Sequence, residues 1–196
     1  MKTRTIEAKP VAVCVTGASG VIYAVRLLEV LSERKIPVHL IVSDAGKIVL
    51  KEELNLSVKS LVSGRDVTLH GIGEIGASVA SGSFVLGSVV ICPCSSNTLG
   101  AVANGVGNNL ICRVGAVALK EKWPLILIPR ESPYSPPLLE NMKLLSIYGA
   151  HILPASPSFY RKPSSIADLV DSVIDRVLVK MGLERLLSPW SGQVSK

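Results

Sequence analysis

Four short runs of apolar residues constrain the fold of this chain more than any other feature of its sequence. Each run has the length of a buried β-strand and is followed by a turn of small residues or proline and then by a helical pattern. The runs cover residues 11–15, 38–42, 89–92 and 125–128. Buried strands that alternate with helices are typical of parallel sheets covered by helices on both faces. We therefore expect an α/β fold with a Rossmann-like, doubly wound parallel sheet in three layers.

The length of the chain, 196 residues, suffices for one packed core and is short for two. We expect an N-terminal arm over residues 1–10, a single domain over residues 11–182 and a C-terminal tail over residues 183–196. Within the domain, the apolar patterns predict helical residues at 25–31, 47–54, 110–120, 136–148 and 165–181, and a short strand at 151–153.

Charged residues are scarce in this chain. They make up 18% of the sequence against 48% hydrophobic residues, and none occurs between Ile75 and Cys112. Glycine, proline, serine and asparagine interrupt that stretch, whereas a membrane span needs about 20 mostly apolar residues, so we expect no membrane span. A surface with so little charge suits contacts between subunits, and we expect a homo-oligomer.

The net charge of +6 does not indicate nucleic-acid binding, because lysine and arginine are spread along the chain and few aromatic rings are available for stacking. The four cysteines, at positions 14, 92, 94 and 112, lie in or beside apolar runs, and no secretory signal precedes them. We expect reduced core thiols, no metal site and a cytoplasmic location. Cys92 and Cys94 are two residues apart, which in a strand places both side chains on one face.

The first apolar run ends in the GASG turn of residues 17–20, at the edge of the sheet where parallel α/β proteins bind ligands. Glycine lets the backbone approach a ligand, and the N-terminus of the next helix favours an anionic group. A nicotinamide dehydrogenase of the short-chain type would need glycines in place of Val21 and Tyr23, and no tyrosine here has a lysine four residues later. Asp44 follows the second run and could hold a ribose, so a dinucleotide stays an alternative.

Polar residues also follow the third and fourth runs. Residues 95–98 are small and polar and enter a helix, where their hydroxyls and the free amides would form either an anion cradle or an ordinary helix cap. Arg130 follows the fourth run and could reach a phosphate or the edge of a flavin. Its neighbour Glu131 could transfer a proton if burial raised its pKa. A surface salt bridge is the alternative for this pair.

Three further cations are candidates for phosphate binding. Arg113 and Lys120 are seven residues apart and therefore lie on one face of the helix predicted at 110–120. Arg176 has no carboxylate three or four residues away on its own helix. Such cations can converge on a phosphate, and exposure to solvent is the alternative for each of them.

Six segments together resemble the UbiX family of flavin prenyltransferases, over nearly the whole chain after residue 10. They are TGASGVIYAVRLLE, ASGSF, ICPCSSNTLGAVANGVGNNLICR, ALKEKWPLILIPRESPYS, LLENMKLLSIYGAHILPASPSFY and SIADLVDSVIDRVL. The resemblance implies a flavoprotein-type fold and a metal-independent, typically dodecameric enzyme. It also implies transfer of a dimethylallyl group from dimethylallyl phosphate or pyrophosphate to N5 and C6 of reduced FMN. The product, prenyl-FMN, would serve a UbiD-type decarboxylase.

The same resemblance assigns roles to individual residues. FMN would be held by Gly17, Ala18, Ser19, Ser43, Ser95, Ser96, Asn97, Thr98 and Arg130. The prenyl phosphate would be bound, partly across subunit interfaces, by Arg113, Lys120, Tyr160, Arg176 and Trp190. The catalytic residues would be Glu131, Lys120, Ser19 and Glu53. Ser19 would lie near the reacting N5, and Glu131 would assist proton movement as the phosphate leaves.

Two other functions are compatible with the same fold. The first is a flavin-dependent decarboxylase of cysteine-containing substrates, whose family shares a related Ser/Asn turn. That family depends on a histidine near the first helices, and no histidine here precedes His39, which disfavours it. The second is a flavin-binding subunit without catalytic activity. Formation of prenylated flavin from reduced FMN and dimethylallyl phosphate would separate the three functions.

Overall fold

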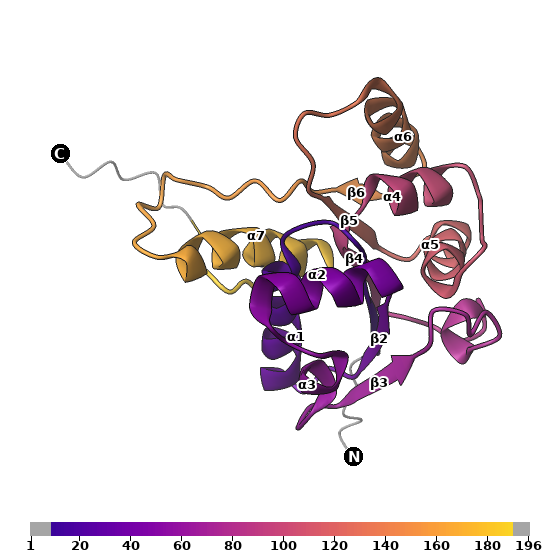
Figure 1. Cartoon of the computed structure of the whole chain (residues 1–196), viewed down its shortest axis with the longest axis horizontal. Helices are drawn as coiled ribbons and strands as arrows, with labels where there is room; N and C mark the ends of the chain where they lie inside the picture. The colour runs from indigo at the N-terminus through magenta and orange to yellow at the C-terminus, as the bar shows by residue number, and fades with distance from the viewer. Residues whose placement is uncertain (1–8, 190–196) are drawn as a thin grey trace, which may run out of the picture.

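The structure, a computed structural model, describes residues 9–189, so most of the predicted arm lies outside the described residues. It contains a six-stranded sheet with the order β3-β2-β1-β4-β5-β6 (Figure 1). All neighbouring strands are parallel. The strands are β1 (Val11–Val15), β2 (Val38–Val42), β3 (Val67–His70), β4 (Ser88–Cys94), β5 (Leu125–Pro129) and β6 (His151–Ile152). The chain winds outward in both directions from β1 and β4, which confirms the predicted doubly wound fold.

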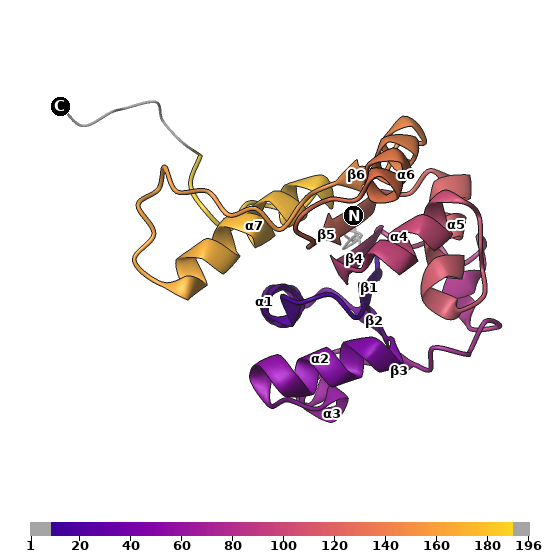
Figure 2. The same cartoon turned by 45° about the horizontal axis from the view of Figure 1, so that its top comes forward.

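Helices cover both faces of the sheet and give the structure three layers (Figure 2). One face packs against α1 (Val21–Glu33), α2 (Asp44–Leu54), α3 (Val58–Val62) and α7 (Ile166–Lys180). The other packs against the short 3-10 helix η1 (Ser78–Ala80), α4 (Ser96–Ala103), α5 (Leu110–Glu121) and α6 (Pro136–Ile147). Within residues 9–189, no helix combines the length and the apolarity that a bilayer crossing requires.

The central strand β1 shows how the sequence fills the two outer layers. Val11, Val13 and Val15 pack with the layer of α1 and α7, whereas Ala12 and Cys14 pack with the layer of α4 and α5. All five residues are at most 3% exposed. A strand that is buried on both faces has no polar side, which is why β1 is recognisable as an uninterrupted apolar run.

The sequence patterns do not predict β3, α3 or η1. The edge strand β3 is half-buried or exposed along its length, so it lacks the apolar run of a central strand. The helix α3 has five residues, of which only Leu61 is buried. The helix α2 begins at Asp44, earlier than the predicted residue 47, because the Ser43 hydroxyl accepts a hydrogen bond from the Gly46 amide at 3.0 Å and caps the helix.

The prediction that Cys92 and Cys94 share one face of a strand is wrong. Cys92 packs in the layer of α1 and α7, and Cys94 packs in the layer of α4 and α5. The pairing of β4 with β5 changes register between Ile91 and Cys94, and such an irregularity reverses the direction of the side chains that follow it. All four cysteines are free and buried, as predicted, and burial raises the pKa of each thiol.

The end of the described chain folds back on α7 and α1. The Asp175 carboxylate of α7 is buried and accepts hydrogen bonds from the amides of Leu186 and Leu187, each at 2.9 Å. Arg34, directly after α1, donates a hydrogen bond to the carbonyl of Glu184 at 2.6 Å. The first residues of the predicted tail are therefore held against the layer that α1 and α7 form.

Two histidines on adjacent strands form a close pair. His39 Nδ1 of β2 lies 2.8 Å from His70 Nε2 of β3, and the two rings stack. The His39 ring also makes a T-shaped contact with the ring of Phe84. Burial lowers the pKa of His39, and the proximity of His70 lowers it further. The folded protein therefore binds a proton at His39 less readily than the unfolded chain does.

We expect the free energy of unfolding to decrease as the pH falls below about 6.5, the ordinary histidine pKa, because the unfolded state then takes up a proton that folded His39 resists. A His39→Gln variant should therefore lose less of its melting temperature than the unsubstituted protein between about pH 7.5 and about pH 5.5. Thermal unfolding at one fixed protein concentration measures both losses. Equal losses in the two proteins would contradict this role of His39.

Candidate functional site

A cavity of about 230 Å³ opens at the carboxyl ends of β1, β4 and β5. Its lining comes from the turns that follow these strands and consists of Gly17, Ala18, Ser95, Ser96, Asn97, Arg130 and Glu131. The winding of the sheet reverses between β1 and β4, which is where open parallel sheets bind ligands. All of these residues belong to the set predicted from the sequence, and the fold brings them together from three distant segments.

The turn after β1 packs tightly between α2 and Arg130. A Cβ atom on Gly17 would lie 2.5 Å from the Cβ of Ala45, so glycine alone fits at this position. Gly20 has a φ of 98°, in the left-handed region that glycine adopts without strain. On the opposite side, Arg130 Nε donates a hydrogen bond to the Ser19 carbonyl at 3.3 Å. Contacts on two sides thus fix the backbone that faces the cavity.

The Glu53 carboxylate, from the last turn of α2, binds the first amides of α1. It accepts hydrogen bonds from the Gly20 amide at 2.9 and 3.1 Å and from the Val21 amide at 3.1 Å. Gly20 has no side chain with which to cap these amides, so a residue distant in the sequence supplies the cap. Of the two adjacent glutamates, Glu53 and not Glu52 makes these contacts among the described residues. The predicted Glu53 therefore lies beside the turn that carries Ser19.

Thr16, which is not among the predicted site residues, joins the ends of β1 and β4. Its hydroxyl donates a hydrogen bond to the Pro93 carbonyl and accepts one from the Ser95 amide, both at 2.7 Å, and the residue is 1% exposed. Ser95 in turn caps α4 by accepting a hydrogen bond from the Thr98 amide. Thr16 is a polar residue directly after an apolar run, and this position could have identified it as a residue of the site.

Two of the predicted flavin-binding residues that lie outside the cavity lining take part in helix caps. The Ser43 hydroxyl caps α2, and the Thr98 hydroxyl accepts a hydrogen bond from Ser95 at 3.1 Å inside the cap of α4. Neither residue lines the cavity. Glu131 does line it and accepts a hydrogen bond from the Ser96 hydroxyl at 3.3 Å. Glu131 is exposed in the single chain, so its burial would require a ligand or a second subunit.

A second cavity, of about 530 Å³, lies where β6 and α7 meet. Its lining is apolar and cationic, without a carboxylate, and consists of Ile152, Leu153, Pro154, Ser156, Arg176, Val179, Lys180 and Arg185. Tyr160 does not line this cavity; its hydrogen bond to Arg161 and the charges of Arg161 and Arg176 lower the pKa of its hydroxyl. An anion with an apolar part fits such a lining.

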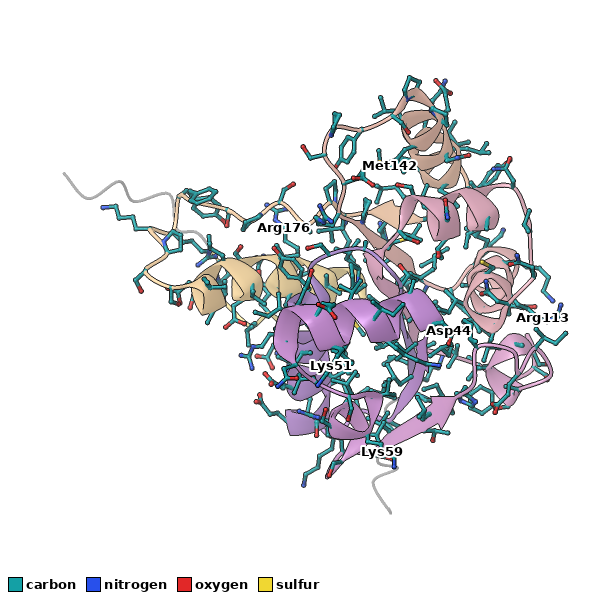
Figure 3. All side chains as sticks on the ribbon, in the orientation of Figure 1. Asp44, Lys51, Lys59, Arg113, Met142 and Arg176 are labelled. Atoms are coloured by element: carbon teal, nitrogen blue, oxygen red, sulfur yellow. The ribbon has the colours of Figure 1, made fainter. Side chains whose placement is uncertain are left out.

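The remaining predicted cations lie on the other side of the sheet. Arg113 and Lys120 are exposed on α5, which covers the face opposite α7, and Figure 3 shows Arg113 at the far edge of the molecule from Arg176. Lys120 Nζ pairs with Glu121 Oε1 at 2.9 Å. One chain therefore does not bring these cations together with Arg176. The predicted Trp190 lies outside the described residues.

No metal-binding arrangement is found in the described part of the chain. Residues 9–189 contain no group of three or more histidine, cysteine, aspartate or glutamate side chains that could hold a metal ion. The linings of the two cavities offer hydroxyls, the carboxylate of Glu131 and arginine or lysine side chains.

Comparison with known proteins identifies the class to which this fold and site belong. The profile of the family described as Flavoprotein matches residues 1–178, so the chain belongs to that family. Flavin prenyltransferase UbiX from Aquifex aeolicus is 44% identical over 186 residues, covering 93% of this chain and 98% of the relative. Flavin prenyltransferase UbiX from Methanocaldococcus jannaschii is 45% identical, covering 94% and 99%. Within the flavoproteins, the chain is a member of the UbiX-type flavin prenyltransferase family.

Solved structures agree with this membership. AnUbiX, crystallised with FMN and dimethylallyl pyrophosphate, has a TM-score of 0.91 and 33% identity, covering 95% of this chain and 99% of that chain. A dodecameric FMN-dependent UbiX-like decarboxylase from Escherichia coli O157:H7 has a TM-score of 0.89 and 35% identity, covering 94% and 100%. The peptidyl-cysteine decarboxylase EpiD, at 20% identity and a TM-score of 0.59, shares the fold alone.

The contribution of the Thr16 hydroxyl to the free energy of unfolding can be tested by substitution. Thr16→Val keeps the shape of the side chain but leaves the Ser95 amide without its acceptor, and the Pro93 carbonyl keeps only its hydrogen bond from the Thr16 amide at 3.3 Å. The loss should cost about 2 kcal/mol of unfolding free energy. Thr16→Ser restores the hydroxyl and should recover most of the loss. Chemical denaturation of the three proteins measures the difference. Equal stability of the valine and serine variants would show that the bridge contributes nothing.

Proposed function

We propose that this chain transfers a dimethylallyl group from dimethylallyl phosphate or pyrophosphate to N5 and C6 of reduced FMN, and that a UbiD-type decarboxylase uses the prenyl-FMN formed. The observation that carries the proposal is 44% and 45% identity to two flavin prenyltransferases over nearly the full length of both proteins. The two cavities described above support it, because the lining of one offers groups that can bind a flavin nucleotide and the lining of the other suits an amphiphilic anion.

The cavity between β1 and β4 is suited to FMN. Close approach to the Gly17 backbone suits a flat ring, the hydroxyls and free amides at the start of α4 suit a phosphate, and Arg130 adds a positive charge. Reduced FMN supplies the electron-rich N5 and C6 that the prenyl group joins. The chain's own contribution is to orient the flavin beside Ser19 and Glu53 and to exclude water from it.

The donor phosphate requires cations, and the second cavity provides Arg176. Positive groups that neutralise a departing phosphate stabilise a transition state with a cation-like allyl group. Arg113 and Lys120, on the opposite side of the sheet, would add to this charge only from a neighbouring subunit. Glu131 would accept the proton released from C6, and burial under that subunit would make it a stronger base.

The exposed apolar side chains of α6 and the assembly of one relative both support an oligomer. Ile147 is 71% exposed and Leu139 is 48% exposed, and Tyr148 directly after the helix is 54% exposed. A helix with an apolar outer face is normally covered, and the UbiX-like relative from Escherichia coli O157:H7 is dodecameric. We propose a homododecamer in which α6 is part of a subunit interface. The four free cysteines fit a cytoplasmic location.

The decisive experiment supplies reduced FMN and dimethylallyl phosphate under anaerobic conditions and follows the mass and absorption spectrum of the flavin. Prenyl-FMN is the expected product. A parallel reaction with dimethylallyl pyrophosphate identifies the preferred donor. Release of carbon dioxide from a cysteine-containing peptide would instead show a decarboxylase. Flavin binding without any reaction would show a non-catalytic subunit.

Lys120 and Glu131 can be tested by variants that keep the flavin site intact. Lys120→Ala and Glu131→Gln should bind FMN with unchanged stoichiometry and form prenyl-FMN about 100-fold more slowly, because each removes a group that acts mainly in the transition state. Single-turnover kinetics measure the rate. Lys59→Ala on α3 and Glu52→Gln on α2 are matched controls that should react normally. Unchanged turnover in Lys120→Ala or Glu131→Gln would overturn the role of that residue.

The proposed interface on α6 predicts a linked loss of assembly and activity. Ile147→Glu places a charge on the exposed apolar face and should dissociate the oligomer, because an unpaired charge buried in an interface is costly. Light scattering measures the mass, and the prenylation assay measures the activity that depends on the neighbouring Arg113 and Lys120. Lys59→Glu serves as the control. Full assembly of the Ile147→Glu variant would exclude this face from the interface.

A further inference from the structure

The N-terminus of α1 is already bound to an anionic group of the protein itself. In dinucleotide-binding Rossmann folds, the first amides of the helix after β1 receive the pyrophosphate of the cofactor. In this chain the same amides, those of Gly20 and Val21, donate to the Glu53 carboxylate at 2.9 to 3.1 Å. The position at which a dinucleotide would bind its pyrophosphate is therefore filled.

We propose that Glu53 is a specificity-determining residue: its carboxylate occupies the anion-binding amides of α1 and thereby excludes the pyrophosphate of a dinucleotide. The proposal rests on the flavin function to the extent that the accepted nucleotide is FMN. Glu53 acts in two ways, because it removes the two donors that a pyrophosphate needs and also places a negative charge where the pyrophosphate charge would lie. The Glu53 carboxylate and a pyrophosphate at the same amides would be two negative charges in close contact, and such charges repel each other strongly.

The packing of α2 holds Glu53 in this position. A Cβ atom on Gly17 would lie 2.5 Å from the Cβ of Ala45, and one on Gly46 would lie 2.8 Å from the Val15 carbonyl oxygen. Two glycines thus allow the first turn of α2 to lie directly on the end of β1. The last turn of the same helix then brings Glu53 to the start of α1, so the carboxylate is positioned by the core.

A mononucleotide has another helix N-terminus available. The first turn of α4 contributes Ser96 and Asn97 to the lining of the cavity, where Arg130 adds a positive charge. The single phosphate of FMN can therefore be bound at α4, while α1 stays closed. A dinucleotide, whose pyrophosphate requires the start of α1, has no equivalent site.

The test compares the binding of ADP and of FMN to the full-length protein and to three variants, by isothermal titration calorimetry. Glu53→Ala frees the amides and should bind ADP about tenfold or more tightly than the unsubstituted protein does. Glu53→Gln removes the charge but keeps an acceptor, so its gain should be smaller. Glu52→Ala is the matched control on the adjacent residue and should bind ADP as weakly as the unsubstituted protein.

The result that overturns the proposal is an unchanged ADP affinity in a Glu53→Ala variant that has a native circular dichroism spectrum. If Glu53→Ala does not fold, Glu53→Gln takes its place in the test. An unchanged ADP affinity in Glu53→Gln would then overturn the proposal. An equal gain in Glu52→Ala would also overturn it, since the effect would then be one of net charge. The proposed function would be overturned by a different result, namely that the unsubstituted protein neither binds FMN nor forms prenyl-FMN. The ADP titrations contain no flavin, so their outcome does not depend on that result.

Discussion

The Thr16 hydroxyl links the carboxyl ends of β1 and β4, the two strands from which the sheet winds outward. A doubly wound sheet places its ligand crevice between the two strands at which the winding reverses, and these strands, β1 and β4, diverge into turns that lead to different helices. Thr16 links those turns through Pro93 and Ser95. This buried bridge ties the start of α4 to the turn after β1, and residues from both segments line the cavity.

The sequence predicts those parts of the structure whose physical signal is local. The buried strands are apolar runs, and the cavity residues from Gly17 to Glu131 follow such runs directly, so their position at one edge of the sheet follows from the parallel topology. The strand β3 gives no such signal because it is half-exposed at the sheet edge. Pairing irregularities and side-chain contacts between distant segments are also invisible in a pattern, which is why the orientation of Cys94 is mispredicted and Thr16 is missed.

The four cations predicted to bind ligands lie in two separate parts of the chain. Arg176 and Arg130 lie near the carboxyl ends of the strands, whereas Arg113 and Lys120 lie on α5, behind the opposite face of the sheet. Concentrating all four around one cavity of a monomer would bring like charges together before any phosphate is present. Carrying them on separate faces avoids that repulsion in the single chain.

The turn after β1 is held at three successive points: Gly17 packs on Ala45, the Ser19 carbonyl accepts a hydrogen bond from Arg130, and the Gly20 amide donates to Glu53. A free loop of this kind would lose conformational entropy each time it closed around a ligand. Here that loss has already occurred during folding of the chain. Binding at this turn is therefore opposed mainly by the entropy of the incoming molecule, and its affinity reflects a surface that is shaped before the ligand arrives.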